Sequence, residues 1–476
     1  MTWIIFSIAS LFFSGSIWLR HSWFQTSSWD LGIFDQATYL ISKGLAPNSS
    51  LLNFHILGDH GSLVLYPIGW LSIIFPTVKL LFFLQGLSLA STVFPLAKIA
   101  KKNNLSKKFT ITSLLVFLLY PIIFNVAIFD FHPEVLAVPL IMEIILLLSY
   151  SNSKYYLRIF LCLLFALTCK ITISFLVVGI GLWMIAKKRI NIGLSISSFG
   201  MIWFILISQV LIPYYGGTEA TISRHLSKFG ISNIDIFNLS NLLENISILC
   251  RQILSIENIS YMFLLLIPIL YICFYKERKN ALSNLFPFTP LFLLNIISSI
   301  SPMKDLVHQY SLFLVPFIAS EVQMSLIYID NGIKVYPKWF SQRASKIILI
   351  WSILTFMILS RVTFFFGPFQ DRFDSISARR EAISKIDSQS AVLTSNDLIP
   401  HLSRRKIIKL TTSDKIDKLD DFDEILLDIN HPGWNSSIEI NSSIIKKLED
   451  NQMWYKKFEK GSVLLFEKSA LQLPIS

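Results

Sequence analysis

Apolar runs of roughly 20 residues, the length that an α-helix needs to cross a bilayer, recur along most of this 476-residue chain. Hydrophobic residues make up 53% of the sequence and charged residues only 15%, which is unusual for a soluble protein. The chain is therefore predicted to be an α-helical polytopic membrane protein. The runs predict about 11 crossings, at residues 3–19, 77–98, 109–128, 133–150, 155–169, 171–186, 192–212, 259–275, 281–300, 309–329 and 346–366.

The formal net charge of +11 indicates membrane topology and gives no support for nucleic-acid binding, because most Lys and Arg residues lie in short loops between the runs. The positive-inside rule makes the basic loops cytoplasmic, namely 98–108, 154–158, 187–189, 276–279 and 334–346. The N-terminus is then cytoplasmic. Loops 20–76 and 213–258, and everything after residue 366, are predicted to lie outside. Arg20 alone argues the other way for the first crossing.

Two domains are predicted, a multispanning membrane domain over residues 1–366 and a soluble extracytoplasmic α/β domain over residues 367–476. The long first outer loop, 20–76, contains two apolar segments of its own. Residues 31–43 predict an interfacial helix. Residues 61–76 are too short for a crossing and are interrupted by proline and glycine, so they favour a surface-lying or re-entrant helix.

After residue 366 the apolar runs shrink to strand length and alternate with helix-like segments. This alternation is typical of a small α/β domain. Strands are predicted at 390–395, 405–411, 423–429 and 462–468, and helices at 375–386 and 438–451.

The stretch "SSWDLGIFDQATYL", residues 27–40, places two carboxylates soon after the first apolar run. Asp30 and Asp35 would lie roughly 140° apart around a helix, so they are not expected to point into one site. Asp30 could instead cap a helix that begins at Leu31, and Asp35 could lie on a solvated face.

Histidine and carboxylate also occur together in "NFHILGDHG", residues 53–61. Two glycines punctuate a turn here, so His55, Asp59 and His60 could reach one cation or one phosphate. The spacing matches no standard metal motif, so the signal for a metal is weak. A divalent metal stays an open alternative.

A second such group lies in "IFDFHPEVLAVP", residues 128–139. Asp130, His132 and Glu134 occupy the predicted tight outer turn between the third and fourth crossings, and the intervening proline suits the start of a helix. They could face the same outer cavity as the first loop, or they could only solvate the tip of the turn.

Two further candidates are single residues. Lys170, in "LTCKITIS", lies between two short apolar runs, where an unpaired charge costs about 3 kcal/mol. It could bind a lipid-linked phosphate, or it could simply extend to the membrane surface. His308, in "KDLVHQYSLF", raises the same question more weakly.

Several of these segments recur, in order, in a known family. The segments are "WDLGIFDQATYL", "FHILGDHGSLVLYPIGWL", "FDFHPE", "CKITIS" and "AVLTSNDLIPHLSRRKIIKL…DEILLDI". Over nearly its whole length the chain resembles the predicted bacterial membrane proteins of domain-of-unknown-function family 2079. That family has an acidic pair shortly after the lysine, whereas this chain has Ile171 and Thr172 there.

The family is distantly similar to the GT-C glycosyltransferases, which take sugars from polyprenyl-phosphate carriers. The resemblance implies a multi-pass protein of the cytoplasmic (inner) membrane that transfers a sugar to an acceptor on the outer face, with membrane lipids and a polyprenyl-phosphate-linked sugar as partners. Asp30 would be the catalytic base, with Asp59 and Asp130 as alternatives. The expected substrate-binding residues are Asp35, His55, His60, His132, Glu134, Lys170 and His308.

In this interpretation the C-terminal domain would bind the acceptor, and its "DLIPHLSRR" stretch offers His401, Arg404 and Arg405. Two functions of other classes remain open. A transporter or flippase for a lipid or polysaccharide would use buried charges such as Glu143 and Lys170 and would need no base. A non-catalytic envelope assembly protein would read its cargo through the outer domain.

Overall fold

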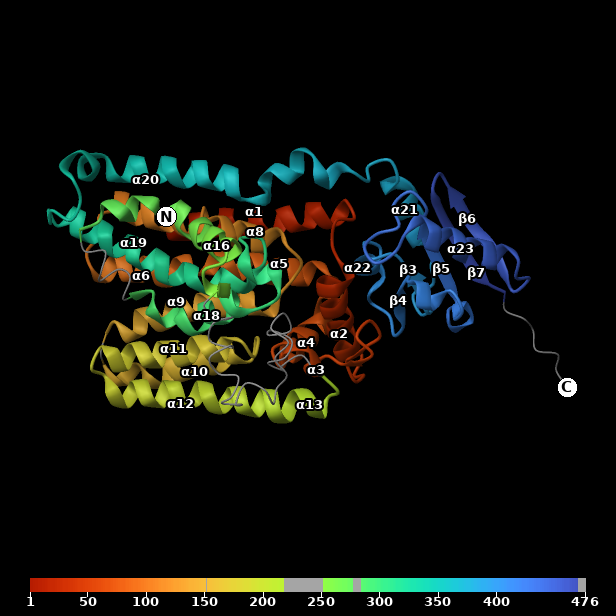
Figure 1. The fold of residues 1–476 in the computed structure, drawn as a ribbon, viewed down its shortest axis with the longest axis horizontal. Coiled ribbons are helices and arrows are strands. Elements are labelled where there is room, and N and C mark those ends of the chain that lie inside the picture. Colours follow the sequence, from red (N-terminus) through yellow and green to blue (C-terminus); the bar gives the residue numbers. More distant parts are fainter. Residues whose placement is uncertain (151, 218–250, 277–283, 470–476) are drawn as a thin grey trace.

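The computed structural model describes residues 1–150, 152–217, 251–276 and 284–469. A bundle of helices forms one end of the molecule and a small sheet domain forms the other, with the short helices of the first loop between them (Figure 1). Helix α1 (Thr2–Ser22) starts in the bundle and runs toward the sheet domain. Much of the predicted outer loop 213–258 and of the basic loop 276–279 lies outside the described residues.

The helices of the bundle follow the apolar runs, and proline stands in the first turn of several of them, where its missing N–H is not needed. They are α5 (Lys79–Ser91), α6 (Val93–Lys102), α7 (Lys107–Leu118), α8 (Pro121–Ile128), α9 (Val138–Leu148), α10 (Tyr156–Leu167), α11 (Ile173–Ala186), α12 (Ile190–Leu206), α13 (Ile212–Tyr214), α16 (Ile256–Leu266), α18 (Thr289–Ile297), α19 (Val315–Asp330) and α20 (Lys338–Leu359).

Among the described residues, 6 helices are long and apolar enough to cross a membrane, or 7 if the bent pair α7 and α8 is one crossing. A multi-pass membrane protein is therefore confirmed, but the predicted count of about 11 crossings is not. The other predicted runs, 133–150, 155–169, 171–186 and 281–300, form α9, α10, α11 and α18, with 11, 12, 14 and 9 residues.

Helices α1 and α5 pack against each other through small side chains. A Cβ atom on Gly86 of α5 would lie 2.8 Å from the backbone nitrogen of Ser14 and 3.1 Å from the carbonyl oxygen of Ser10. Small residues spaced by four let two membrane helices approach closely. Gly86 therefore fixes the spacing between these two helices.

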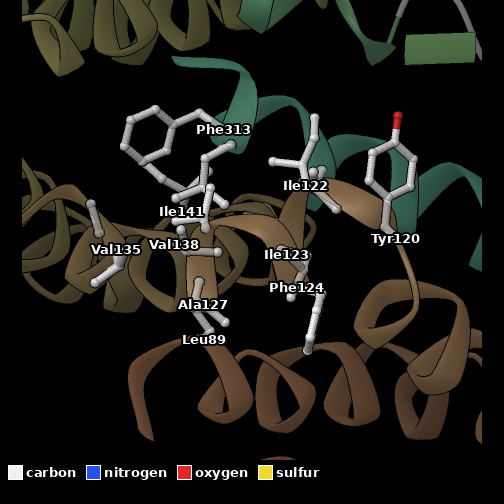
Figure 2. Close-up of a cluster of buried hydrophobic side chains, with 14 of the residues drawn as sticks. Leu89, Tyr120, Ile122, Ile123, Phe124, Ala127, Val135, Val138, Ile141 and Phe313 are labelled. Carbon is white, nitrogen blue, oxygen red and sulfur yellow. The ribbon is translucent and has the colours of Figure 1, made fainter. Parts of the chain in front are cut away.

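A fully apolar cluster lies between α5, α8 and α9 (Figure 2). All 8 residues of α8 are buried. Leu89 of α5 and Ile123 of α8 are completely buried, as are Val138 and Ile141 of α9. A helix that is almost entirely apolar belongs in the interior of a bundle, which explains the position of α8. Its one polar side chain, Asn125, bonds to the backbone of Leu306 and Arg361.

The first loop folds against the bundle as short elements. Helix α2 (Ile33–Ser42) lies within the predicted 31–43 helix, and α4 (Leu65–Ile74) lies within 61–76. Helix α4 has 10 residues, too few to cross a bilayer. Between them come the strands β1 (Asn48–Ser49) and β2 (Phe54–His55) and the helix α3 (Leu57–His60).

The C-terminal residues form the predicted α/β domain. Its 5-stranded sheet has the order β4-β3-β5-β7-β6. The strands β3, β4 and β5 are parallel, and β7 pairs antiparallel with β5 and β6. The elements are α21 (Ile376–Ser384), β3 (Val392–Thr394), α22 (Ile399–Leu402), β4 (Ile408–Leu410), β5 (Glu424–Asp428), α23 (Ile438–Glu449), β6 (Trp454–Lys460) and β7 (Val463–Lys468).

All four predicted strands and both predicted helices of this domain are confirmed, whereas strand β6 was not predicted. The sequence of β6, "WYKKFEK", is mostly charged because β6 is an edge strand whose side chains are largely exposed. Charged residues on an edge strand oppose pairing with other chains.

Replacing Gly86 by alanine is expected to lower the free energy of unfolding by about 1–3 kcal/mol, because the new methyl group meets the backbone of α1. Chemical denaturation in mixed micelles measures this change. Gly15→Ala is the matched control, since nothing lies within 4 Å of its Cβ position. Equal stability of the two variants would contradict close packing of α1 on α5.

Candidate functional site

A cavity of about 790 Å³ lies where the first loop, the bundle and the sheet domain meet. Its apolar wall comes from α11, α13 and the end of α18, through residues such as Phe175, Ile212 and Leu294. The charged residues come from loops that are far apart in the sequence. They are Asp30, Asp59, His60, His132 and Lys170.

Asp30 lies in a π-helical turn, η1 (Ser28–Gly32), directly before α2. The hydroxyl of Ser27 caps this turn and accepts a hydrogen bond from the Trp29 N–H at 3.3 Å. The alternative that Asp30 is the helix cap is therefore wrong. Single π-helical turns occur frequently at functional sites, and this one leaves the Asp30 side chain 31% exposed.

Asp30 forms an ion pair with His132. The Asp30 Oδ1 atom lies 3.1 Å from His132 Nε2, and His132 Nδ1 lies 2.7 Å from the backbone oxygen of Asp130. Both ring nitrogens face oxygen atoms, and with an ionised Asp30 this arrangement favours the protonated imidazole, in which both nitrogens donate. Burial alone would raise the pKa of Asp30 and lower that of His132, but their mutual attraction outweighs burial. The pKa of Asp30 is lowered and the pKa of His132 is raised.

Lys170 forms a second ion pair, with Glu134. Its Nζ atom lies 2.6 Å from Glu134 Oε1, and the two side chains are 5% and 3% exposed. Burial opposes both charges, but the pairing raises the pKa of Lys170 and lowers that of Glu134. The ammonium group also lies 5.1 Å from the ring centre of Tyr310, within reach of a cation–π interaction. The predicted lysine is thus held at the cavity wall as a cation.

The 53–61 segment contributes two of its three predicted residues. Asp59 and His60 line the cavity, with Asp59 Oδ1 3.6 Å from His60 Nδ1. The backbone oxygen of His60 accepts a hydrogen bond from the Ile171 N–H at 3.2 Å, which ties this loop to the turn that carries Lys170. His55 does not line the cavity. Its ring stacks on that of Tyr215 instead, with 4.0 Å between the ring centres.

Four other predicted site residues do not line this cavity either: Glu134, which pairs with Lys170, and three that have partners elsewhere. Asp35 accepts hydrogen bonds from Ser403 at 2.7 Å and from Arg404 at 2.9 Å. Asp130 pairs with Arg20 at 2.7 Å. His308 pairs with Asp305 at 2.7 Å. The spacing argument for Asp30 and Asp35 is confirmed, because the two carboxylates meet different partners.

The "DLIPHLSRR" residues do not offer a free surface for an acceptor. The His401 ring is stacked on His21 of α1 at 3.9 Å. Arg404 binds Asp35, and the buried Arg405 donates to the backbone oxygen of Leu402 at 2.6 Å. This stretch joins the sheet domain to the first loop, and its role in binding an acceptor stays a prediction.

The sequence matches the family described as "Predicted membrane protein (DUF2079)" over residues 20–465. The chain belongs to this family. A search of the curated proteins found no match.

Two solved structures of ArnT from Cupriavidus metallidurans share the fold of this DUF2079 protein. The structure bound to undecaprenyl phosphate has a TM-score of 0.56 at 10% sequence identity and covers 98% of both chains. The apo structure has a TM-score of 0.53 at 9% identity and covers 94% of this chain and 96% of that chain. The comparison therefore shows that the chain has the fold of ArnT.

The described part of this DUF2079 chain contains no cluster of metal-ligand side chains. No group of three or more His, Cys, Asp or Glu side chains is arranged there to hold a metal ion. Asp30 at the cavity pairs with His132, and Glu134 pairs with Lys170, so both carboxylates already face a basic side chain of the protein.

The sequence interpretation missed several residues that shape the site. Trp29 and Tyr310 line the cavity, next to or near residues that the sequence did indicate. Trp434 lines it from the sheet domain, about 400 residues along the chain from Asp30, and no local pattern indicated it. Buried Gln85 donates to the oxygen of Phe129 at 3.0 Å and accepts from the His132 N–H at 3.2 Å, so it braces the 129–132 turn.

Replacing Lys170 by methionine is expected to lower the free energy of unfolding by about 3 kcal/mol, because Glu134 is left as an uncompensated buried charge. The double variant Lys170→Met with Glu134→Gln should recover most of this loss. Chemical denaturation in mixed micelles provides the comparison. Lys460→Met is the control, since it breaks the exposed pair with Glu381 and should change stability little. A double variant as unstable as Lys170→Met would refute the pairing.

Proposed function

We propose that this DUF2079 protein is a GT-C glycosyltransferase that takes a sugar from a polyprenyl-phosphate carrier and passes it to an acceptor on the outer face of the cytoplasmic membrane. The observation that carries the proposal is the single cavity in which Asp30, His132 and Lys170 meet an apolar wall. The shared fold with the undecaprenyl-phosphate-bound ArnT structure supports it. The distribution of Lys and Arg supports the outer placement of the cavity and of the sheet domain.

The cavity offers both parts that a polyprenyl phosphate needs. Apolar side chains of α11, α13 and α18, including Phe175 and Ile212, suit an isoprenoid chain. The cations of His132 and Lys170 suit the phosphate, because an acidic partner favours the charged form of each. Ligand pockets combine an apolar lining with a few polar groups in this way.

The reaction forms a bond between an acceptor oxygen and the anomeric carbon while the bond from that carbon to the phosphate oxygen breaks. The leaving polyprenyl phosphate keeps the electron pair, and His132 and Lys170 stabilise the negative charge. The proton of the acceptor hydroxyl passes to the Asp30 carboxylate, which acts as general base. Attack from the face opposite the phosphate inverts the configuration of the sugar.

Donor binding also prepares Asp30 for this role. Without a ligand, His132 lowers the pKa of Asp30 and makes it a weak base. A phosphate beside His132 competes with Asp30 for the imidazolium, and its negative charge raises the pKa of the nearby carboxylate. Asp30 therefore becomes a stronger base when the donor is in place.

Asp30→Asn is expected to abolish at least about 99% of the transfer, because the amide cannot accept the proton. Folding should persist, since the substituted side chain is isosteric and partly exposed. Undecaprenyl-phosphate binding should persist in part, because Lys170 keeps its charge through Glu134 even when His132 loses the carboxylate that favours its cation. Lipid-linked glycan profiling of a deletion strain that carries the variant measures transfer, and native mass spectrometry of the purified protein measures lipid binding. Asp59→Asn is the matched control within the cavity.

The outcome also separates the other classes of function. A flippase would keep its activity in Asp30→Asn, and an assembly protein would show no transferred sugar in the wild type. Loss of transfer in Asp59→Asn but not in Asp30→Asn would move the base to Asp59.

Undecaprenyl-phosphate binding is expected to weaken as the pH rises through the pKa of His132. Asp30 raises that pKa above its ordinary value of about 6.5, so the imidazolium and its contribution to folding are fully present below that value. Both are lost when His132 loses its proton at higher pH. Affinity measured between about pH 6 and pH 9 tests this, with His132→Gln as the control that should show a flatter profile. An unchanged slope in His132→Gln would assign the titration to another group.

A further inference from the structure

The loop "NHPGWNSS", residues 430–437, follows strand β5 and carries an exposed tryptophan at the cavity. Trp434 is 57% exposed and lines the cavity together with Asp30. Large aromatic side chains that stay exposed beside a charged pocket are typical of binding surfaces. The reaction proposed above uses no residue of this loop.

The backbone of the loop holds Trp434 in a defined position. Gly433 has a φ of +80°, and a Cβ atom there would lie 3.0 Å from Asp397 Oδ1 and 3.3 Å from the backbone nitrogen of Asn396. Asn435 also has a positive φ, of 63°. At the start of the loop, His431 pairs with Asp374 at 3.0 Å. Left-handed backbone on both sides of Trp434 and a close approach to its neighbours restrict where the indole can point.

Trp434 meets Trp29, the neighbour of Asp30 in the π-helical turn. The two ring centres are 6.0 Å apart and the ring planes are at 86°, so the indoles form a corner and not a parallel stack. Trp29 is 38% exposed and also lines the cavity. A flat ligand seated in this corner meets one indole face and one indole edge close to the Asp30 carboxylate.

The topology of the sheet explains why this loop reaches the site. The parallel strands β3 and β5 end at the same edge, and ligands bind beyond the carboxyl ends of such strands. Asn396, just after β3, accepts hydrogen bonds through Oδ1 from the Ser28 N–H at 3.1 Å and from the Ser28 hydroxyl at 2.6 Å. The same edge therefore supports the turn that carries Asp30 and presents Trp434.

We propose that Trp434 and Trp29 form a carbohydrate subsite that seats a sugar ring of the acceptor, and this assignment to the acceptor rests on the proposed function. The C–H groups on one face of a pyranose ring pack on an indole face, while the ring hydroxyls remain free for solvent and for the charged residues. A sugar held in this corner has a hydroxyl within the same cavity as Asp30. The sheet domain thus contributes directly to acceptor recognition.

The test uses the full chain in nanodiscs and three soluble probes, chitotriose, mannotriose and maltotriose, in ligand-observed NMR titrations. We expect the wild type to bind at least one of them and Trp434→Ala to bind it about 10-fold more weakly, the effect of losing one aromatic contact. Trp434→Phe should stay within about threefold of the wild type, because it keeps a ring. Trp339→Ala is the matched control, since Trp339 is 56% exposed but does not line the cavity.

Failure of the subsite and failure of the proposed function give different results. Sugar binding that depends on Trp434 without any transfer in the wild type would retain the subsite and refute the transferase. Transfer that is unchanged in Trp434→Ala, or a wild type that binds none of the three probes, would refute the subsite alone. Vesicles that contain brominated lipid provide a further check, because quenching that disappears in Trp434→Phe would show that the indole anchors in the bilayer and would overturn the proposal.

Discussion

The site depends on pairing every charge that the 130–134 turn brings into the protein. Asp130 pairs with Arg20 at the end of α1, His132 with Asp30, and Glu134 with Lys170. An unpaired charge in such a buried place costs several kcal/mol, so each pair also fixes the position of a separate segment. One turn of five residues thereby holds together the first helix, the π-helical turn that carries Asp30 and the loop before α11.

The same turn is supported by uncharged contacts on its inner side. Gln85 of α5 braces its backbone, and the Ser27 N–H donates to Asp130 Oδ2 at 2.7 Å, which ties the turn to the residue that caps η1. Next to it, α8 and α9 contribute to the cluster of buried hydrophobic side chains shown in Figure 2. The charged groups are therefore placed by a rigid surface, as catalytic groups require.

How far the sequence predicts this structure depends on the range of the interactions involved. Membrane class, α2 and the strands of the C-terminal domain follow from local apolar patterns, and the 130–134 turn follows from its proline and its density of charges. The partners of those charges were not predictable, because pairs such as Arg20 with Asp130 join residues 110 positions apart. The crossing count was also not predictable, since short helices such as α10 and α11 have crossing-like composition without crossing length.

The difference between the sequence prediction and the structure is largest for the sheet domain. Nothing in "DLIPHLSRR" distinguishes a docking segment from a ligand-binding one, because His401, Arg404 and Arg405 have suitable chemistry for either. Only the fold shows that Arg404 already pairs with Asp35 and that His401 already stacks on His21. Trp434 is the reverse case. In the sequence its loop resembles an ordinary turn, and only the fold shows that the loop after β5 places Trp434 at the cavity.

The arrangement of the cavity favours a transferase over a transporter. A transport path has to continue from the outer cavity through the bundle, and it needs polar or removable side chains along its length. Directly after Glu134 the chain instead continues with the completely buried residues Val135, Val138 and Ile141, packed against α5 and α8 (Figure 2). The charged residues thus share one cavity with Trp434 of the sheet domain. In the proposed reaction the lipid-linked phosphate would lie along the apolar wall and the acceptor would meet the sheet domain, an arrangement that suits a reaction between two bound molecules.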